Sequence, residues 1–184
     1  MTTSLTYTLE IASYAIKQAA GHLCPKEVSK CLSLLNSCYK RNSKVLISGV
    51  GKSGIVARKI ASTFSSVGMK SVYLNPLDAL HGDIGLIDTS DICLLISNSG
   101  ETDELKKFVY HLKKRGVELI SIVGNITSSI AKQSDCVLAA NIDKELCPLN
   151  LAPTASTTVS LAIGDALVIE WMRINEISAN DFAQ

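Results

Sequence analysis

Five short apolar runs alternate with amphipathic stretches through most of this chain, and this alternation limits the fold more than any other feature. The runs lie at residues 45–47, 71–74, 92–96, 119–123 and 136–139. Stretches of helical periodicity separate them, at 54–67, 101–115 and 128–133. Near-continuous apolar strands between helices are typical of a parallel sheet covered on both faces. The sequence therefore predicts an α/β fold with a doubly wound, five-stranded parallel sheet in flavodoxin-like order.

Helices are also expected on either side of this alternating region. Two are predicted before the first strand, at 4–20 and 26–40, with His22 and Pro25 marking the turn between them. One long helix is predicted at about 155–175. The length of 184 residues and the 47% apolar composition suit one globular domain. We expect residues 1–184 to form that domain, with N-terminal helices at 1–42 and the α/β core at 43–184.

The charge balance argues against nucleic acid or a membrane surface as a partner. The chain has 18 Lys and Arg residues and 17 Asp and Glu residues, a net charge of +1. Its main basic cluster falls on the predicted helix at 101–115, where it is expected to form a solvated face. Glu10 lies where a signal peptide would be apolar, and Asp165 and Glu170 interrupt the most apolar helix. These features predict a cytoplasmic protein.

The six cysteines indicate reduced thiols, because no CxxC pair occurs among them. Cys24, Cys31 and Cys38 are seven residues apart and are expected to share one buried helical stripe. Cys93 and Cys136 lie within predicted strands. These five cysteines are therefore interpreted as small buried residues, and all six as reduced thiols of the cytoplasm.

Two Gly/Ser runs directly follow the first and third predicted strands: GVGKSG at 49–54 and SNSGET at 97–102. Each is expected to be a strand-to-helix turn, where free backbone N–H groups face an anion. Their side chains add hydroxyl donors and one positive charge, from Ser53, Ser97, Ser99, Thr102 and Lys52. We call these two runs the phosphate clamp, because together they predict a site for a small phosphate ester.

Two other phosphate motifs fit the first run less well. A Walker loop needs Gly five positions before Gly51, where the chain has Leu46. The dinucleotide fingerprint GxGxxG is matched, but the acid expected about 20 residues later is missing, since the next predicted strand is followed by Asn75 and no acid occurs before Asp78. A nicotinamide cofactor is therefore disfavoured, and no cofactor is expected.

His81 is the histidine most suited to chemistry. It lies beside Gly82 and Asp83 in a predicted loop, 75–83, on the expected ligand side of the sheet. His22 lies at a helix junction and His111 lies on a helix among lysines, so both are expected to be surface residues.

Two glutamates are further candidates. Glu101 is expected to start a helix, where the helix dipole favours a carboxylate regardless of function. Glu145 lies in a loop, 144–153, that also contains Cys147 and two prolines. A metal site formed by His81, Glu145 and Cys147 is conceivable, but their spacing matches no familiar ligand pattern, so no metal is expected.

Five segments in this order, GVGKSG, HGDIG, SNSGET, KELCPLNLAPTASTT and GDAL, resemble the sugar isomerase (SIS) domain family and, within it, the arabinose 5-phosphate isomerases. The resemblance covers residues 44–183, and the segment 144–158 is its most specific part. It implies reversible aldose–ketose isomerisation of D-ribulose 5-phosphate and D-arabinose 5-phosphate through a cis-enediol, which feeds Kdo and lipopolysaccharide synthesis.

The resemblance also implies the site residues. The substrate-binding set is Gly51, Ser53, Ser97, Asn98, Ser99, Thr102, Thr154, Ser156 and Thr157. The catalytic set is Lys52, His81, Glu101 and Glu145. In our hypothesis Glu145, with a raised pKa, moves the carbon-bound proton. Lys52 stabilises oxyanion charge, Glu101 orients Lys52 or moves hydroxyl protons, and His81 assists proton transfer between the oxygens.

Family members are tetramers whose sites draw on neighbouring subunits, so a homotetramer is implied, with His81 donated across an interface. Many members continue into two CBS domains, and this sequence has none. The family also places a histidine just after its Asp-Phe-Ala segment, and this sequence stops at Gln184 before that point. A chain shortened relative to the natural protein is our expectation. The other possibility is that the natural protein lacks this histidine. For the function, the alternatives to an arabinose 5-phosphate isomerase are a non-catalytic sugar-phosphate sensor and another phosphosugar isomerase.

Overall fold

The computed structural model describes residues 4–178, so the Asp-Phe-Ala segment at 181–183 lies outside the described residues. Its five strands form one all-parallel sheet in the order β2-β1-β3-β4-β5. The strands are β1 (Val45–Gly49), β2 (Ser71–Tyr73), β3 (Ile92–Ser97), β4 (Glu118–Val123) and β5 (Cys136–Ala139). This confirms the predicted α/β class and the flavodoxin-like order. The strand order reverses between β1 and β3, which is where such sheets bind ligands.

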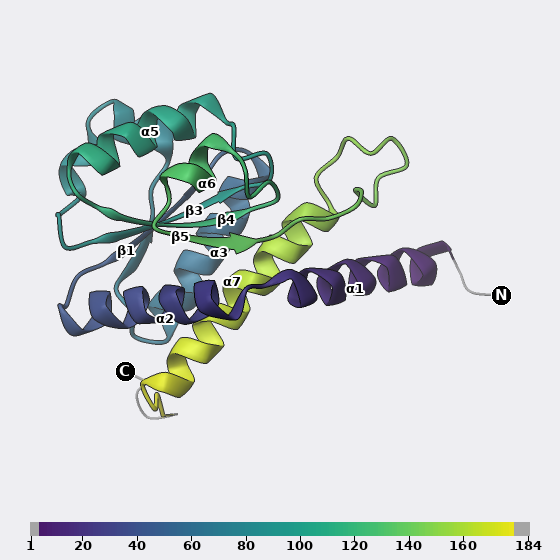
Figure 1. The fold of residues 1–184 in the computed structure, drawn as a ribbon, viewed down its shortest axis with the longest axis horizontal. Coiled ribbons are helices and arrows are strands. Elements are labelled where there is room, and N and C mark those ends of the chain that lie inside the picture. Colours follow the sequence, from purple (N-terminus) through teal and green to yellow (C-terminus); the bar gives the residue numbers. More distant parts are fainter. Residues whose placement is uncertain (1–3, 179–184) are drawn as a thin grey trace.

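Helices cover both faces of the sheet (Figure 1). One face packs against α2 (Pro25–Lys40), α3 (Lys52–Ser66) and α7 (Ala155–Ile174), in a core around Phe64 and Trp171. The other packs against α4 (Pro76–Leu80), α5 (Asp103–Lys114) and α6 (Ser129–Gln133), in a core around Phe108. Successive strand residues alternate between the two cores: Leu94 belongs to the first and Leu95 to the second. Burial on both faces explains the continuous apolar runs.

The first helix, α1 (Ser4–His22), extends away from the sheet as an arm (Figure 1). The segment that joins β5 to α7 projects on the same side. Only Ala19 is buried on α1, whereas α2 and α7 bury several side chains each. Within residues 4–178, no helix is long and apolar enough to cross a membrane.

The structure corrects the prediction of an irregular loop at 75–83. That segment contains α4 and continues into a 3-10 helix, Asp83–Leu86. Asn75 Oδ1 accepts a hydrogen bond from the Leu77 N–H at 3.0 Å, and Pro76 occupies the first helical position. An Asn cap followed by Pro is a helix start signal, so the prediction missed a local pattern that was present.

The expected cysteine stripe is only partly present. Cys31 and Cys38 are buried, but Cys24 is exposed, because it precedes the first residue of α2 and lies outside the helical period. Cys93 and Cys136 are buried as predicted, and all six cysteines are free thiols. His22 and His111 are exposed, which confirms their expected surface positions.

Candidate functional site

The two turns of the phosphate clamp lie on adjacent strands at the switch point of the sheet. Gly49, at the end of β1, pairs with Ile96 of β3. Gly51 precedes α3 and Thr102 precedes α5, and neither helix start has a side-chain cap. By contrast, α6 is capped by the Ser128 hydroxyl, which accepts a hydrogen bond from the Ala131 N–H. In the first turn of α3 the Gly54 N–H already donates to Val50 O at 3.3 Å, so the N–H groups of Lys52 and Ser53, together with those at the start of α5, are the ones available to an anion from outside the chain.

The hydroxyl groups of the second run shape their own turn. Ser97 is buried, and its Oγ accepts a hydrogen bond from the Gly100 N–H at 3.1 Å and lies 3.3 Å from Thr102 Oγ1. Ser99 Oγ accepts one from the Glu101 N–H at 3.2 Å. Because Ser97 and Ser99 accept these N–H groups, their own hydroxyl hydrogens can be donated to a ligand.

The second turn also rests on the loop after β4 and on α6. Gly124 N donates to the Asn98 carbonyl at 3.0 Å, and Ile130 N donates to the Gly100 carbonyl at 3.2 Å. Gly100 has a φ of +65°, and a Cβ there would lie 2.0 Å from Ser128 Oγ. Only glycine fits this position, because the backbone is left-handed and α6 packs directly against it.

Glu101 does not start a helix, because α5 begins at Asp103. Its carboxylate instead accepts a hydrogen bond from the Ser129 N–H at 2.6 Å, and Lys106 Nζ lies 3.6 Å away. The Ser129 N–H, with a smaller contribution from Lys106, lowers the pKa of this exposed carboxyl. In this structure Glu101 ties the second turn to α6.

The Glu145 carboxylate closes the start of α7. It accepts hydrogen bonds from the Thr154 N–H at 2.8 Å, from Thr154 Oγ1 at 3.2 Å, from the Ser156 N–H at 3.2 Å and from Ser156 Oγ. Burial by itself would raise the pKa of Glu145, but these hydrogen bonds outweigh it and the net pKa is lowered. The expected raised pKa is therefore wrong, because the carboxylate meets donors nine and eleven residues along the chain.

A cleft of about 200 Å³ joins the first turn to the start of α7. It is lined by Lys52, Ile55, Val56, Thr157, Thr158 and Leu161. The structure thus brings Lys52 next to the segment that holds Glu145. His81 is exposed at the end of α4, and within residues 4–178 no hydrogen bond or ion pair joins His81 or Glu101 to Lys52 or Glu145. His81 and Glu101 do not line this cleft, and within the described part of the chain no hydrogen bond or ion pair joins Lys52 to Glu145 either.

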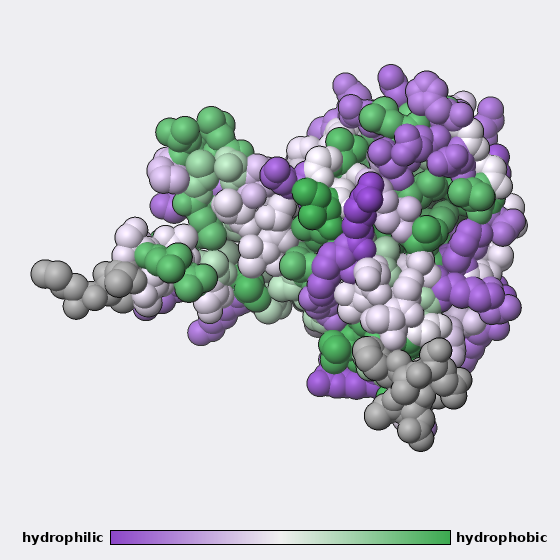
Figure 2. All heavy atoms as spheres, turned by 180° about the vertical axis from the view of Figure 1, so that it is seen from behind, coloured by the Kyte–Doolittle hydropathy of each residue, from purple (hydrophilic) through white to green (hydrophobic). Residues whose placement is uncertain are grey.

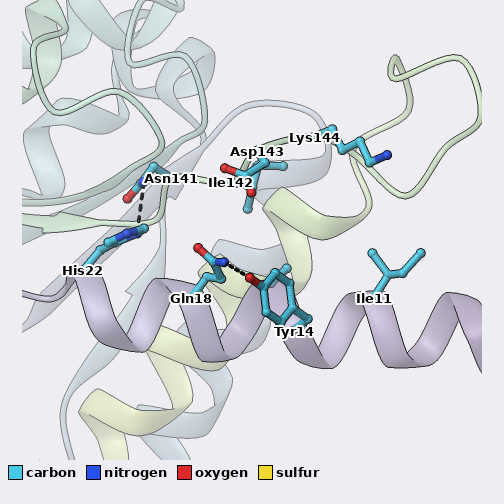
Figure 3. Close-up of a pocket in the computed structure, with 9 residues that line it drawn as sticks. Ile11, Tyr14, Gln18, His22, Asn141, Ile142, Asp143 and Lys144 are labelled. Atoms are coloured by element: carbon cyan, nitrogen blue, oxygen red, sulfur yellow. Dashed lines mark hydrogen bonds between the residues drawn. The ribbon is translucent and has the colours of Figure 1, made fainter.

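A second hollow, of about 140 Å³, lies between α1 and residues 141–144 (Figure 3). Ile11, Tyr14 and Ile142 give it apolar walls, and His22 Nδ1 lies 3.2 Å from Asn141 Nδ2 at one end. None of the predicted site residues lines it. It is therefore separate from the phosphate clamp.

Two residues that support the clamp were not identified from the sequence. Ser129 supplies the N–H that binds Glu101, and the Tyr73 hydroxyl donates to the Gly49 carbonyl at 3.2 Å. Serine in the first turn of α6 provided only a general helix-start signal. Tyr73 provided no signal beyond its place in a strand, because the contact depends on how β2 ends relative to β1.

The fold and the two uncapped helix ends define an open α/β domain with a candidate anion site at its switch point. The SIS domain family matches residues 38–170, and the chain belongs to this family. It is 43% identical over 182 residues to Arabinose 5-phosphate isomerase KpsF of Escherichia coli O6:H1, covering 99% of this chain and 55% of that protein. It is 46% identical over 140 residues to Arabinose 5-phosphate isomerase KdsD of Pseudomonas aeruginosa, covering 76% and 43%.

The chain thus spans about half the length of these curated relatives. Among solved structures, it is similar to an E. coli CFT073 protein in complex with arabinose 5-phosphate, with a TM-score of 0.87 and 35% identity. That match covers 100% of this chain and 97% of the other.

Proposed function

We propose that this chain is an arabinose 5-phosphate isomerase that interconverts D-ribulose 5-phosphate and D-arabinose 5-phosphate. The observation that carries the proposal is the pair of uncapped helix ends at the switch point, with Lys52 beside them. They suit a single small phosphate group. Support comes from the relatives named arabinose 5-phosphate isomerase and from the similar structure that holds arabinose 5-phosphate.

In the proposed mechanism the clamp holds the phosphate while a proton moves between C1 and C2 of the opened sugar. The phosphate ligands are Ser53, Ser97, Ser99 and Thr102, with backbone groups of Gly51 and Asn98. The start of α7, through Thr154, Ser156 and Thr157, faces the sugar. Lys52 lines the cleft between these two parts and stabilises negative charge on the enediolate oxygen.

We propose Glu145 as the base that moves the carbon-bound proton. Its lowered pKa keeps it ionised at neutral pH, although it makes the carboxylate a weaker base than the raised pKa expected from sequence. One carboxylate oxygen accepts from Ser156 Oγ and the other from Thr154 and Ser156 backbone N–H groups. The oxygen bound by the Ser156 hydroxyl is the better candidate for the base, because a hydroxyl can rotate away and a backbone N–H cannot.

His81 and Glu101 complete the proposed catalytic set, His81 by helping protons move between O1 and O2. His81 is exposed at the end of α4, and the family resemblance suggests that it acts in the site of a neighbouring subunit. We therefore propose a homotetramer. The α1 arm supports it, because Leu5, Tyr7 and Leu9 are each at least 60% exposed there. Figure 2 shows hydrophobic residues on the projecting part of the molecule. Sedimentation that shows a monomer would remove the shared site.

We further propose that residues 1–184 form one domain, that the protein acts in the cytoplasm, and that its product serves Kdo and lipopolysaccharide synthesis. These proposals come from the sequence and the family resemblance. A deletion strain that recovers Kdo when this chain is supplied would test the pathway.

Proton NMR of D-ribulose 5-phosphate incubated with the protein in D₂O tests the activity. The proposal predicts D-arabinose 5-phosphate carrying deuterium at C2, because the proton added to C2 exchanges with solvent during the enediol step. An aldose other than arabinose 5-phosphate would indicate a different phosphosugar isomerase. An unchanged substrate spectrum, from a protein that still binds inorganic phosphate, would contradict the isomerase.

A non-catalytic sugar-phosphate sensor is the second candidate, and one observation favours it. Both candidate carboxylates, Glu101 and Glu145, accept backbone N–H groups at helix starts, which is a structural role that needs no chemistry. A sensor would bind D-arabinose 5-phosphate without exchanging its C2 proton, so the same NMR experiment separates the two functions.

A further inference from the structure

Tyr73 reaches the phosphate clamp from the edge strand. Ile47 O accepts a hydrogen bond from the Leu74 N–H at 3.0 Å, so alternate carbonyls of β1 face β2. The next such carbonyl is that of Gly49, but β2 has already ended at Tyr73. The Tyr73 hydroxyl fills this place and donates to Gly49 O at 3.2 Å. A side chain thus continues the hydrogen bonding where the strand stops.

The same hydroxyl touches the first turn of α3. A Cβ on Gly54 would lie 2.7 Å from Gly49 O and 3.0 Å from Tyr73 Oη, so helix, strand end and hydroxyl are already in close contact. The guanidinium of Arg58, one turn further along α3, lies 4.5 Å from the centre of the Tyr73 ring. Tyr73 is therefore held between the end of β1 and the first two turns of α3.

We infer that Tyr73 is a positioning residue for the phosphate clamp, although no sequence pattern marked it. By fixing the Gly49 carbonyl against α3, its hydroxyl holds the intervening turn in the conformation that points its N–H groups at the phosphate. This inference rests on the proposed phosphate-binding function of that turn. It concerns binding of the phosphate group, and Tyr73 does not take part in the proton transfers.

The variant Tyr73→Phe tests this inference, because it removes only the hydroxyl. We expect the Kd for inorganic phosphate, followed by ³¹P NMR, to rise about threefold to tenfold, the range for one neutral hydrogen bond. The KM for D-ribulose 5-phosphate should rise by the same factor, with kcat within about twofold. The control is Tyr110→Phe, since Tyr110 is exposed on α5, away from β1; it should change neither constant.

A second variant tests the inference even if Tyr73→Phe does not fold. Arg58→Gln keeps the hydroxyl and removes the cation above its ring, so it should raise the phosphate Kd in the same direction but by less than Tyr73→Phe. An unchanged phosphate Kd in folded Tyr73→Phe would overturn the inference, as would a loss of kcat at constant KM. Absence of turnover in the wild type would remove the proposed isomerase but not this inference, because phosphate binding is measured separately.

Discussion

The starts of α3 and α5 differ from the start of α7 in how their N–H groups are bound. The starts of α3 and α7 nevertheless share one cleft, which is lined by Lys52 and Thr157. At α3 and α5 the cap residue makes no side-chain hydrogen bond to the helix, although Asp103 and Glu104 lie in the first turn of α5. At α7 a carboxylate from the same chain, Glu145, already accepts the N–H groups of Thr154 and Ser156. A helix start that lacks an internal anion is suited to an external one, whereas a helix start that has one is closed. In the proposed function, this difference favours the phosphate at α3 and α5 and the sugar at the start of α7.

Of the predicted changes, Glu145→Gln should have the largest effect, and it tests the role given to the start of α7. The amide keeps an acceptor for the α7 N–H groups but cannot take a proton, so kcat for isomerisation should fall about 10²- to 10⁴-fold. The matched control is Glu118→Gln, which removes a carboxylate that pairs with Arg41 on the surface. If Glu145→Gln keeps near-normal kcat, Glu145 is a helix cap only and the base lies elsewhere.

A pair of serine variants should separate the two kinds of helix start. Ser97→Ala removes a donor of the clamp and should weaken inorganic phosphate binding about tenfold or more, since hydrogen bonds to charged groups are strong. Ser156→Ala removes a hydroxyl at the closed start of α7 and should leave that affinity unchanged. Isothermal titration with phosphate measures both. Equal losses of phosphate affinity in the two variants would show that phosphate does not prefer the clamp over the start of α7.

Gly100→Ala should act on stability. The left-handed backbone alone costs about 1–2 kcal/mol with a side chain, and the new Cβ would meet Ser128. We expect the free energy of unfolding to fall by at least this amount in urea denaturation. The control is Gly85→Ala, where a Cβ meets nothing within 4 Å and φ is not positive, so the change should stay within about 0.5 kcal/mol. A similar loss at both positions would contradict the described packing on α6.

Acid should weaken the closed start of α7, with the smallest effect of the four. The pKa of Glu145 lies below its ordinary value of 4.5 in the folded protein, so its contribution to stability is present above that value and is lost as the pH falls through the lowered pKa. We expect the free energy of unfolding of the wild type to exceed that of Glu145→Gln by about 1 kcal/mol near pH 7 and by less near pH 3. Urea denaturation at both pH values checks this. A difference that grows in acid would show that the pKa of Glu145 is raised, not lowered, in the folded protein.

The sequence predicted the sheet well because each strand is buried on both faces, and continuous apolar runs such as 92–96 are typical of strands in that environment. It predicted both clamp turns for a similar reason, since Gly/Ser runs at strand ends follow local rules. The prediction of a loop at 75–83 was wrong because a local helix cap at Asn75 was overlooked, whereas the wrong predictions for Glu101 and Glu145 concerned their partners. The pKa of Glu145 depends on Thr154 and Ser156, and the position of Glu101 depends on Ser129, 28 residues away. Contacts of this kind are set by tertiary packing and leave no local pattern.

A crystal structure of this chain with D-arabinose 5-phosphate would test the central comparison most directly. We predict the phosphate between the starts of α3 and α5, within hydrogen-bonding distance of the Ser53 N–H and the Ser97 hydroxyl, with Glu145 still bound to Thr154 and Ser156. A phosphate at the start of α7, or in the hollow beside α1, would contradict the assignment.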